Sequence, residues 1–249
     1  MNKLDNIAKV ALITGGARRI GAEIAKTLHY DGYNILVHYR HSSDDAKQLC
    51  ADLNGIRPNS CHSFQADLAD SDAYEKIIQN TIHTYGQLDA LINNASSFYP
   101  TPIEEVTEAQ WQDLLTSNLK APIFLSKYAT PWLKKTKGSI INIIDIYANR
   151  PLANHPIYCA AKAGTQSLTK SLARDLNGEV RVNGVAPGAI LWPEDDAGVD
   201  PQQAILARIP MNTLGEPQDI AKTIRFLLND APYINGQIIS VDGGRSVMP

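Results

Sequence analysis

Short apolar runs alternate with longer amphipathic segments along most of the chain, and this alternation constrains the fold more than any other feature. The apolar runs cover residues 10–14, 34–39, 61–67, 88–94, 139–145, 180–187 and 237–244. Their length suits strands that are covered on both faces. The intervening segments 21–32, 73–86 and 217–230 carry apolar residues at helical spacing. The pattern predicts an α/β protein with a doubly wound parallel sheet and helices on both faces.

Composition narrows the class of protein further. The 249 residues, 44% of them hydrophobic, are expected to form a single domain over residues 1–249. A net charge of −3 with scattered basic residues argues against nucleic acid as a partner. The three cysteines show no metal-binding spacing, so we expect free thiols and no metal. No apolar run reaches the roughly 18 residues of a membrane span, and no signal peptide is evident, so we expect a cytoplasmic protein with no membrane partner.

One long segment, residues 189–213, has no clear periodic pattern. It is long for a connection in a compact α/β protein. We therefore expect a substrate loop there, able to act as a lid.

A glycine-containing turn, TGGARRIG at residues 14–21, joins the first apolar run to a helical segment. Ligands of doubly wound sheets bind at the carboxyl ends of the strands, and helix N-terminal amides there can hold a pyrophosphate. We expect Gly15, Arg18, Arg19 and Ile20 to contact such a cofactor, with Arg18 directed at phosphate. A tight strand-to-helix turn without any ligand has the same local pattern.

The second apolar run ends in HYRHSS (residues 38–43), without the acidic residue that binds a free ribose 2′-hydroxyl. Arg40, His41 and Ser42 offer positive charge and hydrogen-bond donors to a 2′-phosphate. This favours NADPH/NADP+ over NADH, with His38 and Tyr39 as further contacts. A solvated basic loop is the alternative.

Asp67 follows the third apolar run, within QADLAD. Its carboxylate could accept a hydrogen bond from an adenine amino group, beside Leu68. A plain helix cap would have the same pattern.

Tyr158 and Lys162 are four residues apart in a predicted helix that Asn154 and Pro156 open, so they share one face. A lysine ammonium beside a phenol stabilises the phenolate and lowers its pKa, which makes tyrosine a proton donor near neutral pH. This spacing alone also arises by chance, so its context decides.

The context resembles the short-chain dehydrogenase/reductase family over essentially the whole chain. The resemblance is carried, in order, by TGGARRIG, Asp67-Leu68, NNA (93–95), Asn118, Tyr158 with Lys162, Pro187-Gly188 and VDGG (241–244). It implies a Rossmann-like fold, Tyr158 as proton donor, Lys162 as its pKa modifier and nicotinamide-ribose ligand, and Asn118 as a kink-forming holder of a relay water. It also implies a homotetramer that uses residues 120–135, residues 157–176 and the C-terminal strand. The cofactor contacts that it adds are Asn94, Ala95, Ser96, Tyr158, Pro187 and Gly188.

Three departures from the common family pattern are informative. Asp145 stands where the family pattern has its catalytic serine. Arg19 replaces the middle glycine of the turn, and Ser96 replaces the glycine that follows NNA. Together with NNASSFYP (93–100) and HYR (38–40), they resemble the pteridine reductases. The resemblance implies a small-molecule pterin or folate substrate.

The chemistry of a pterin fits these residues. Its flat ring offers a π-face to Phe98, and its polar edge needs donors and acceptors such as Ser96, Arg19 and Asp145. Asp145 beside Tyr158 can hold or share a proton that goes to a ring nitrogen. The alternatives are a capping or ion-paired Asp145 and a Phe98 that belongs to the core.

The sequence thus predicts an NADPH-dependent pteridine reductase that reduces dihydropterin, with biopterin or folate as further substrates, to the tetrahydro form. The alternatives are a dihydromonapterin or dihydrofolate reductase, a general carbonyl or 3-oxoacyl reductase, and a cofactor-bound regulatory protein without turnover. The preferred pterin side chain and oxidation state stay open. The predicted catalytic residues are Asp145, Tyr158, Lys162 and Asn118, and the predicted substrate-binding residues are Arg19, Ser96, Phe98, Asp145 and Tyr158.

Overall fold

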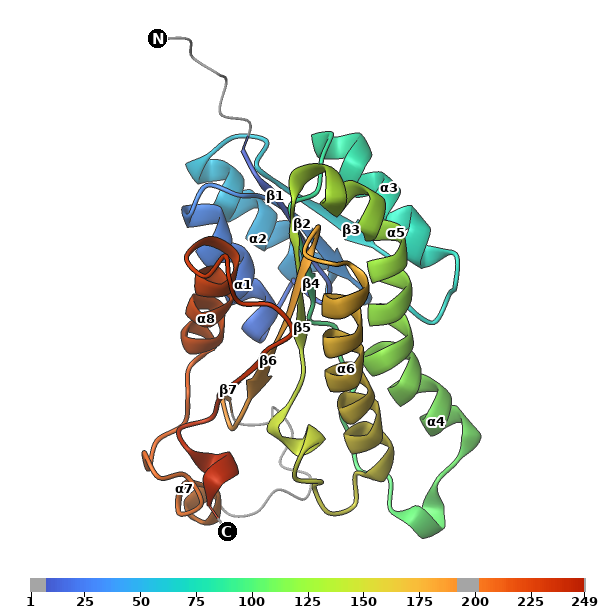
Figure 1. The fold of residues 1–249 in the computed structure, drawn as a ribbon, viewed down its shortest axis with the longest axis vertical. Helices are drawn as coiled ribbons and strands as arrows, with labels where there is room; N and C mark the ends of the chain where they lie inside the picture. Colours follow the sequence, from blue (N-terminus) through green and yellow to red (C-terminus); the bar gives the residue numbers. More distant parts are fainter. Residues whose placement is uncertain (1–7, 192–201, 249) are drawn as a thin grey trace.

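A computed structural model describes residues 8–191 and 202–248 of the chain. Its centre is a seven-stranded parallel sheet in the order β3-β2-β1-β4-β5-β6-β7 (Figure 1). The strands are β1 (Val10–Ile13), β2 (Asn34–Tyr39), β3 (Cys61–Gln65), β4 (Ala90–Asn93), β5 (Ser139–Ile143), β6 (Arg181–Pro187) and β7 (Ile238–Val241). The predicted Rossmann-like, doubly wound sheet is confirmed. Most strands are slightly shorter than the apolar runs that predict them.

Helices separate the strands along the chain. They are α1 (Arg19–Tyr30), α2 (Ser43–Ile56), α3 (Ala73–Tyr85), α4 (Glu108–Leu115), α5 (Ala121–Thr136), α6 (Pro156–Asp175), α7 (Gln202–Leu206) and α8 (Pro217–Asn229). The three segments with predicted helical spacing appear as α1, α3 and α8. Gly86 ends α3 in a left-handed conformation with φ 79°, which glycine adopts without strain.

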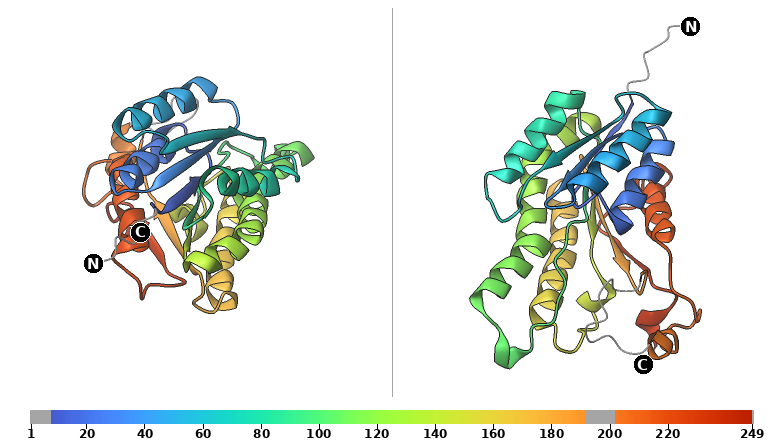
Figure 2. Two further views of the ribbon diagram at one scale, coloured as in Figure 1. Left: turned by 90° about the horizontal axis from the view of Figure 1, so that it is seen from above. Right: turned by 180° about the vertical axis from the view of Figure 1, so that it is seen from behind.

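The helices cover the sheet on both faces (Figure 2). Helices α1, α2 and α8 pack on one face, and α3, α5 and α6 pack on the other. Neighbouring residues of one strand therefore enter different cores: Ile13 joins the first and Leu12 the second, and both are fully buried. Burial on both faces explains why the strands read as continuous apolar runs.

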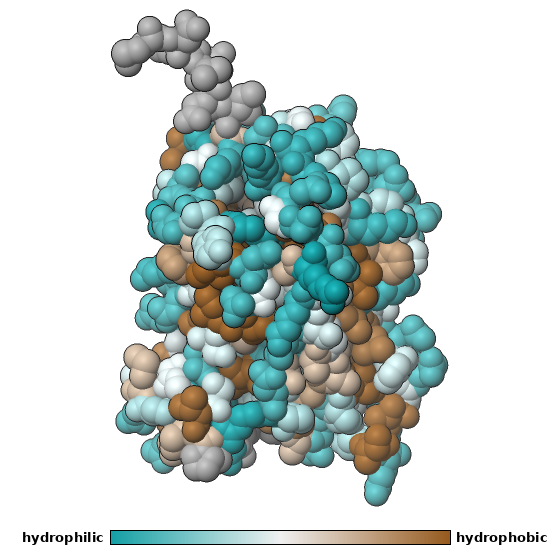
Figure 3. Space-filling view, in the orientation of Figure 1, coloured by the Kyte–Doolittle hydropathy of each residue, from teal (hydrophilic) through white to brown (hydrophobic). Residues whose placement is uncertain are grey.

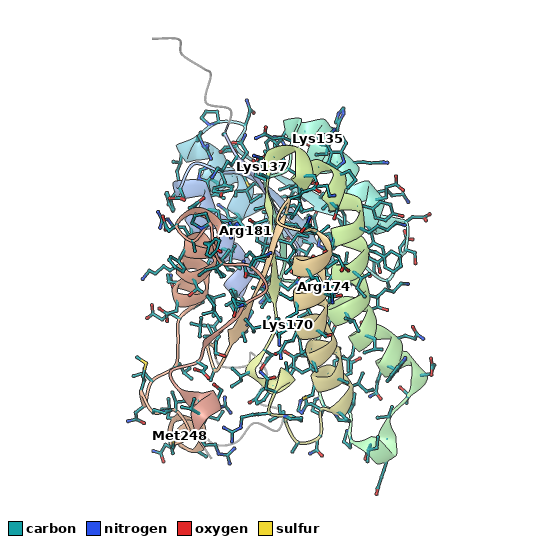
Figure 4. All side chains as sticks on the ribbon, viewed as in Figure 1. Lys135, Lys137, Lys170, Arg174, Arg181 and Met248 are labelled. Atoms are coloured by element: carbon teal, nitrogen blue, oxygen red, sulfur yellow. The ribbon has the colours of Figure 1, made fainter. Side chains whose placement is uncertain are left out.

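Helix α6 combines exposed and buried cations. Lys170 and Arg174 project from its exposed side (Figure 4). Lys162, on the same helix, is only 2% exposed. A buried lysine without a paired carboxylate is unusual in proteins and marks this end of α6 as a candidate functional site.

The predicted substrate loop, residues 189–213, is only partly covered, because residues 192–201 lie outside the described residues. The short helix α7 lies within the remainder, and Ile205 and Ile209 are buried. The segment is thus less irregular than the sequence predicts, and its role as a lid stays a prediction. Within residues 8–191 and 202–248, none of the helices has both the length and the apolar character needed to cross a membrane.

Candidate active site

The turn after β1 requires glycine because α1 and the segment after β4 press against it. Gly15 has φ 58°, and a Cβ there would lie 3.0 Å from the Ala95 Cα. A Cβ on Gly21 would overlap the Gly15 carbonyl and lie 2.7 Å from the Asn94 Nδ2. The first turn of α1 thus stays close to the sheet, with its amides at the carboxyl edge, as a pyrophosphate ligand needs.

Side chains of the NNA segment fix it to this turn. The Thr14 hydroxyl accepts hydrogen bonds from the backbone amides of Asn94 and Ala95, both at 3.0 Å. The Asn94 Nδ2 donates to the carbonyls of Thr14 and Gly15, both at 2.9 Å. The predicted cofactor residues Asn94 and Ala95 therefore lie against the glycine turn, and the Asn94 side chain holds the backbone of that turn in place.

A cavity of about 530 Å³ opens beside the turn, within the size range of small-molecule sites. The predicted cofactor residues that line it are Gly15, Arg18, His38, Tyr39, Arg40, His41, Ser42, Asp67, Leu68, Ala95 and Ser96. The others, Arg19, Ile20, Asn94, Tyr158, Lys162, Pro187 and Gly188, do not line this cavity. Its remaining wall comes from residues that the sequence did not single out: Ala17, Ala69, Ser97, Gln112, Asp113, Thr116, Ser117 and Lys120.

Arg40 is held by carboxylates at the mouth of this cavity. Its Nε lies 3.1 Å from the Asp67 Oδ2, and its Nη1 lies 3.9 Å from the Asp113 Oδ1 of α4. The end of β2 carries no carboxylate, as the sequence indicates, but two other segments each supply one beside Arg40. Arg18 similarly approaches Asp45 of α2, at 3.8 Å.

Asp67 is not a helix cap, because α3 begins only at Ala73. Besides pairing with Arg40, its carboxylate accepts a hydrogen bond from the Ala69 amide at 2.9 Å. The carboxylate also lines the cavity. An adenine-binding role therefore remains a prediction.

His38 supports the glycine turn through a hydrogen bond and adds no positive charge to the cavity. It is 2% exposed, its Nδ1 accepts from the Gly15 amide at 3.3 Å, and its Nε2 lies 3.1 Å from the Ala66 carbonyl. Burial lowers the pKa of His38 to about 4. The ring is therefore neutral at physiological pH, which matches one accepting and one donating nitrogen.

Arg19, the first residue of α1, has a left-handed backbone with φ 52°. The common family residue here is glycine, and a side chain in this conformation costs about 1 kcal/mol. Such strain is typical of functional sites. Ile20, its neighbour, packs against the core beneath α1.

Asp145 and Tyr158 form a direct pair. The Tyr158 hydroxyl donates to the Asp145 Oδ2 at 2.7 Å, while the Asp145 Oδ1 accepts from the Tyr147 amide at 2.9 Å. Asp145 therefore does cap a short 3₁₀ helix, Ile146–Ala148, as the alternative interpretation holds, and it contacts the predicted proton donor as well. Removal of the carboxyl group from solvent raises the pKa of Asp145, although these hydrogen bonds oppose the effect.

Lys162 does not set the net direction of the Tyr158 pKa shift in this arrangement. Burial, followed by the neighbouring Asp145, raises the pKa of Tyr158 well above its ordinary value. The Lys162 Nζ lies 5.6 Å from the Tyr158 ring centroid and donates to the Ile143 carbonyl at 3.0 Å. Burial lowers the pKa of Lys162 itself to about 8. Desolvation and a nearby carboxylate outweigh the ammonium charge.

Asn118 lies in a π-helical turn, Thr116–Lys120, between α4 and α5. Its Nδ2 donates to the carbonyls of Leu114 at 3.0 Å and Ser97 at 2.9 Å, and its Oδ1 accepts from the Ser96 hydroxyl at 2.6 Å. A π-turn interrupts regular helix geometry and is frequent at functional sites. The structure thus joins Asn118 to Ser96, while the relay water stays a prediction.

Phe98 is 52% exposed, so the interpretation as a core residue is wrong. Its ring stacks on His155, with centroids 4.8 Å apart and planes 12° apart. It meets Tyr158 edge-on, also at 4.8 Å between centroids. His155 is a site residue that the sequence reasoning missed, because only the fold brings it under Phe98.

Arg245 is a second missed residue. Its guanidinium lies 5.6 Å from the Tyr147 ring centroid, and its charge is among the influences that lower the pKa of Asp145. It directly follows the VDGG run, which in the sequence carries only the family resemblance. No signal in the sequence predicts that Arg245 lies near Asp145, because the two residues are far apart along the chain and an arginine alone does not indicate such a contact.

A doubly wound sheet with a glycine turn, a cavity at its carboxyl edge and a tyrosine–lysine pair beside it defines the class of NAD(P)H-dependent oxidoreductases. The comparisons with known proteins narrow this class. A family model described as enoyl-(acyl carrier protein) reductase matches residues 15–246. The chain belongs to the short-chain dehydrogenase/reductase family.

Two kinds of relative have similar sequence identity to this chain. Pteridine reductase 1 of Leishmania tarentolae is 34% identical over 281 aligned positions, covering 96% of this chain and 97% of that protein. The 3-oxoacyl-[acyl-carrier-protein] reductase FabG of Staphylococcus aureus is 36% identical, covering 96% and 98%. The protein of the same name from Thermotoga maritima is 31% identical, covering 95% and 97%. Identity alone therefore does not assign the substrate.

Proposed function

We propose that this chain is an NADPH-dependent reductase of pterin C=N bonds that converts dihydropterin to the tetrahydro form. The observation that carries the proposal is the 2.7 Å hydrogen bond between Tyr158 and Asp145, the residue that replaces the common family serine. A carboxyl group with a raised pKa can be held protonated and can donate to a ring nitrogen, which a serine hydroxyl does poorly.

NADPH supplies the hydride, and the chain's own residues handle the proton. Asp145 gives its proton to the substrate nitrogen, and the carboxylate that remains accepts the hydrogen bond of the Tyr158 hydroxyl, which keeps its own proton because its pKa is raised. Lys162, with a pKa of about 8, is mostly an ammonium at neutral pH and stabilises the resulting negative charge. The Tyr147 amide and the Ile143 carbonyl hold Asp145 and Lys162 in position for this transfer.

Phe98 fits the flat face of such a substrate. His155 backs the ring, and its edge contact with Tyr158 places it beside the proton donor. Ser96, which is held by Asn118, and Arg19 at the start of α1 serve the polar edge of the pterin.

The preference for NADPH rests on Arg40, whose ion pairs with Asp67 and Asp113 hold it at the cavity mouth. These ion pairs are about half exposed and therefore weak, so a 2′-phosphate, which carries more charge than a carboxylate, replaces them on the guanidinium. Asp67 would then be free to accept from the adenine.

The active form is proposed to be a cytoplasmic homotetramer. Hydrophobic side chains gather over the β7 edge of the sheet and over the lower part of α5 and α6 (Figure 3). Ile238 and Val241 of β7 are only partly buried. Exposed apolar patches of this kind mark association surfaces.

The second candidate is a 3-oxoacyl reductase, which the 36% identity to the Staphylococcus aureus protein favours. Asp145 argues against it, because the common family serine polarises the carbonyl oxygen of a ketone substrate. A regulatory protein without turnover is a third possibility, and the Tyr158, Lys162 and Asn118 set argues against it.

A substrate panel with NADPH separates these functions. Dihydrobiopterin, biopterin, dihydromonapterin, dihydrofolate and a 3-oxoacyl thioester would each be assayed with the wild type, Asp145→Ser and Asp145→Asn. We expect turnover with dihydropterins, and a loss of about 100-fold in kcat for both variants without a change in NADPH affinity. Preference for the thioester, or full pterin activity in Asp145→Ser, would contradict the proposal. Absence of NADPH oxidation with every substrate would favour the regulatory function.

A further inference from the structure

Two of the three cysteines face each other inside the molecule. Cys50 lies on α2, and Cys61 is the first residue of β3, which α2 covers (Figure 2). Their sulfur atoms are 3.1 Å apart, with the Cys61 thiol donating to the Cys50 sulfur. Cys159 sits elsewhere, on α6, where its sulfur accepts from the Leu152 amide.

The backbone around the pair is held rigidly. The Asn54 Oδ1, one turn after Cys50, accepts from the amides of Ser60 at 2.9 Å and Cys61 at 3.0 Å. Its Nδ2 donates to the Cys61 carbonyl at 2.8 Å. One side chain of α2 thus fixes the start of β3, so the two thiols stay opposed.

We propose that Cys50 and Cys61 are an oxidation site at which a peroxide forms a reversible intramolecular disulfide. A disulfide requires a sulfur–sulfur distance of about 2 Å, so the two atoms need to approach by only about 1 Å. The proposal does not rest on the proposed reductase function, because neither thiol belongs to the Tyr158 region.

The pair is chemically asymmetric. The hydrogen bond from Cys61 lowers the pKa of Cys50, whereas the hydrogen bond to Cys50 raises the pKa of Cys61. Cys50 is also more exposed, at 9% against 1%. Thiolate character and access favour Cys50 as the group that reacts first.

The reaction then balances in two steps. The Cys50 thiolate attacks one peroxide oxygen, the O–O bond breaks, and a sulfenic acid forms with release of hydroxide, which takes up the proton that the Cys50 thiol lost on ionisation and leaves as one water. The Cys61 sulfur attacks the Cys50 sulfur and expels hydroxide, which takes the Cys61 proton and leaves as a second water. Two thiols are oxidised by two electrons, one peroxide is reduced, and a thiol reductant reverses the bond.

The position of the bond gives it a structural consequence. Helix α2 begins at Ser43, directly after Arg40–Ser42, and Gln65 at the end of β3 donates to the Arg40 carbonyl at 2.9 Å. The disulfide would therefore join the two elements that flank the Arg40 segment of the cavity.

Peptide mapping of the full chain tests the proposal. The reduced protein would be treated with hydrogen peroxide under native conditions, alkylated in denaturant and digested with a protease that cleaves at Asp52, between the two cysteines. We expect two of the three thiols to resist alkylation, a cross-linked Cys50–Cys61 peptide pair 2 Da lighter than its reduced parts, and an alkylated Cys159. Dithiothreitol should restore all three thiols.

Matched variants control the result. Cys159→Ser should still form the bond. Cys50→Ser should leave both remaining thiols open to alkylation, whereas Cys61→Ser should form no bond and leave Cys50 oxidised to a sulfenic acid. Separate peptides with Cys50 over-oxidised to a sulfinic acid, or a bond that includes Cys159, would overturn the proposal. The wild-type map decides alone if a serine variant fails to fold.

Discussion

Lys162 is expected to destabilise the folded chain at neutral pH, and replacing it by methionine should show this. Burial lowers its pKa from 10.5 to about 8. At 1.36 kcal/mol per pKa unit, keeping the ammonium buried costs roughly 3 kcal/mol at pH 7. Lys162→Met removes this cost but leaves the Ile143 carbonyl without its donor, which costs about 1 kcal/mol. The net gain is about 2 kcal/mol in the free energy of unfolding.

The pH dependence distinguishes this effect from ordinary repacking. Because the folded pKa is the lower one, the unfolded chain binds the extra proton between pH 8 and 10.5, and wild-type stability rises with pH across that range. The advantage of Lys162→Met should therefore shrink from pH 7 to pH 10 and reverse above that.

Urea denaturation of both proteins at pH 7 and pH 10 measures the difference. Lys170→Met, which removes an exposed lysine of the same helix, should change the stability by no more than about 0.5 kcal/mol at either pH. A Lys162→Met variant that is less stable than the wild type by the same amount at both pH values would refute the reasoning.

Three further substitutions test the site. Arg40→Asp should lower the preference for NADPH over NADH at least tenfold in kcat/KM, since each charge-assisted contact contributes about 1.5 to 3 kcal/mol; equal use of both cofactors by the wild type would contradict this. Phe98→Ala should raise KM for dihydropterin with little change in kcat, because loss of a stacking face costs about 1 kcal/mol in ground and transition states alike. In steady-state kinetics, a lower kcat with an unchanged KM would contradict this prediction. Gly21→Ala should lower Tm and weaken cofactor binding, because its Cβ overlaps the Gly15 carbonyl; calorimetry showing an unchanged Tm would count against the packing argument.

The sequence determined the features that depend on local patterns. Continuous apolar runs indicated strands that are buried on both faces, and the alternation of these runs with helical segments predicted a doubly wound sheet. The glycine turn and the shared face of Tyr158 and Lys162 follow from spacing along one turn or one helix, so they too were predictable. Asp145, 13 residues before Tyr158, was found because it replaces a family residue.

Only the tertiary structure decided the features that depend on contact between distant segments and on desolvation. Asp113 of α4 reaches Arg40, and His155 stacks on Phe98, because packing and not sequence order sets their distances. The sign of the Tyr158 pKa shift likewise depends on how far burial and Asp145 outweigh Lys162, a balance that residue spacing does not contain. The opposed thiols of Cys50 and Cys61 belong to the same group: eleven positions apart, they meet because α2 lies on β3.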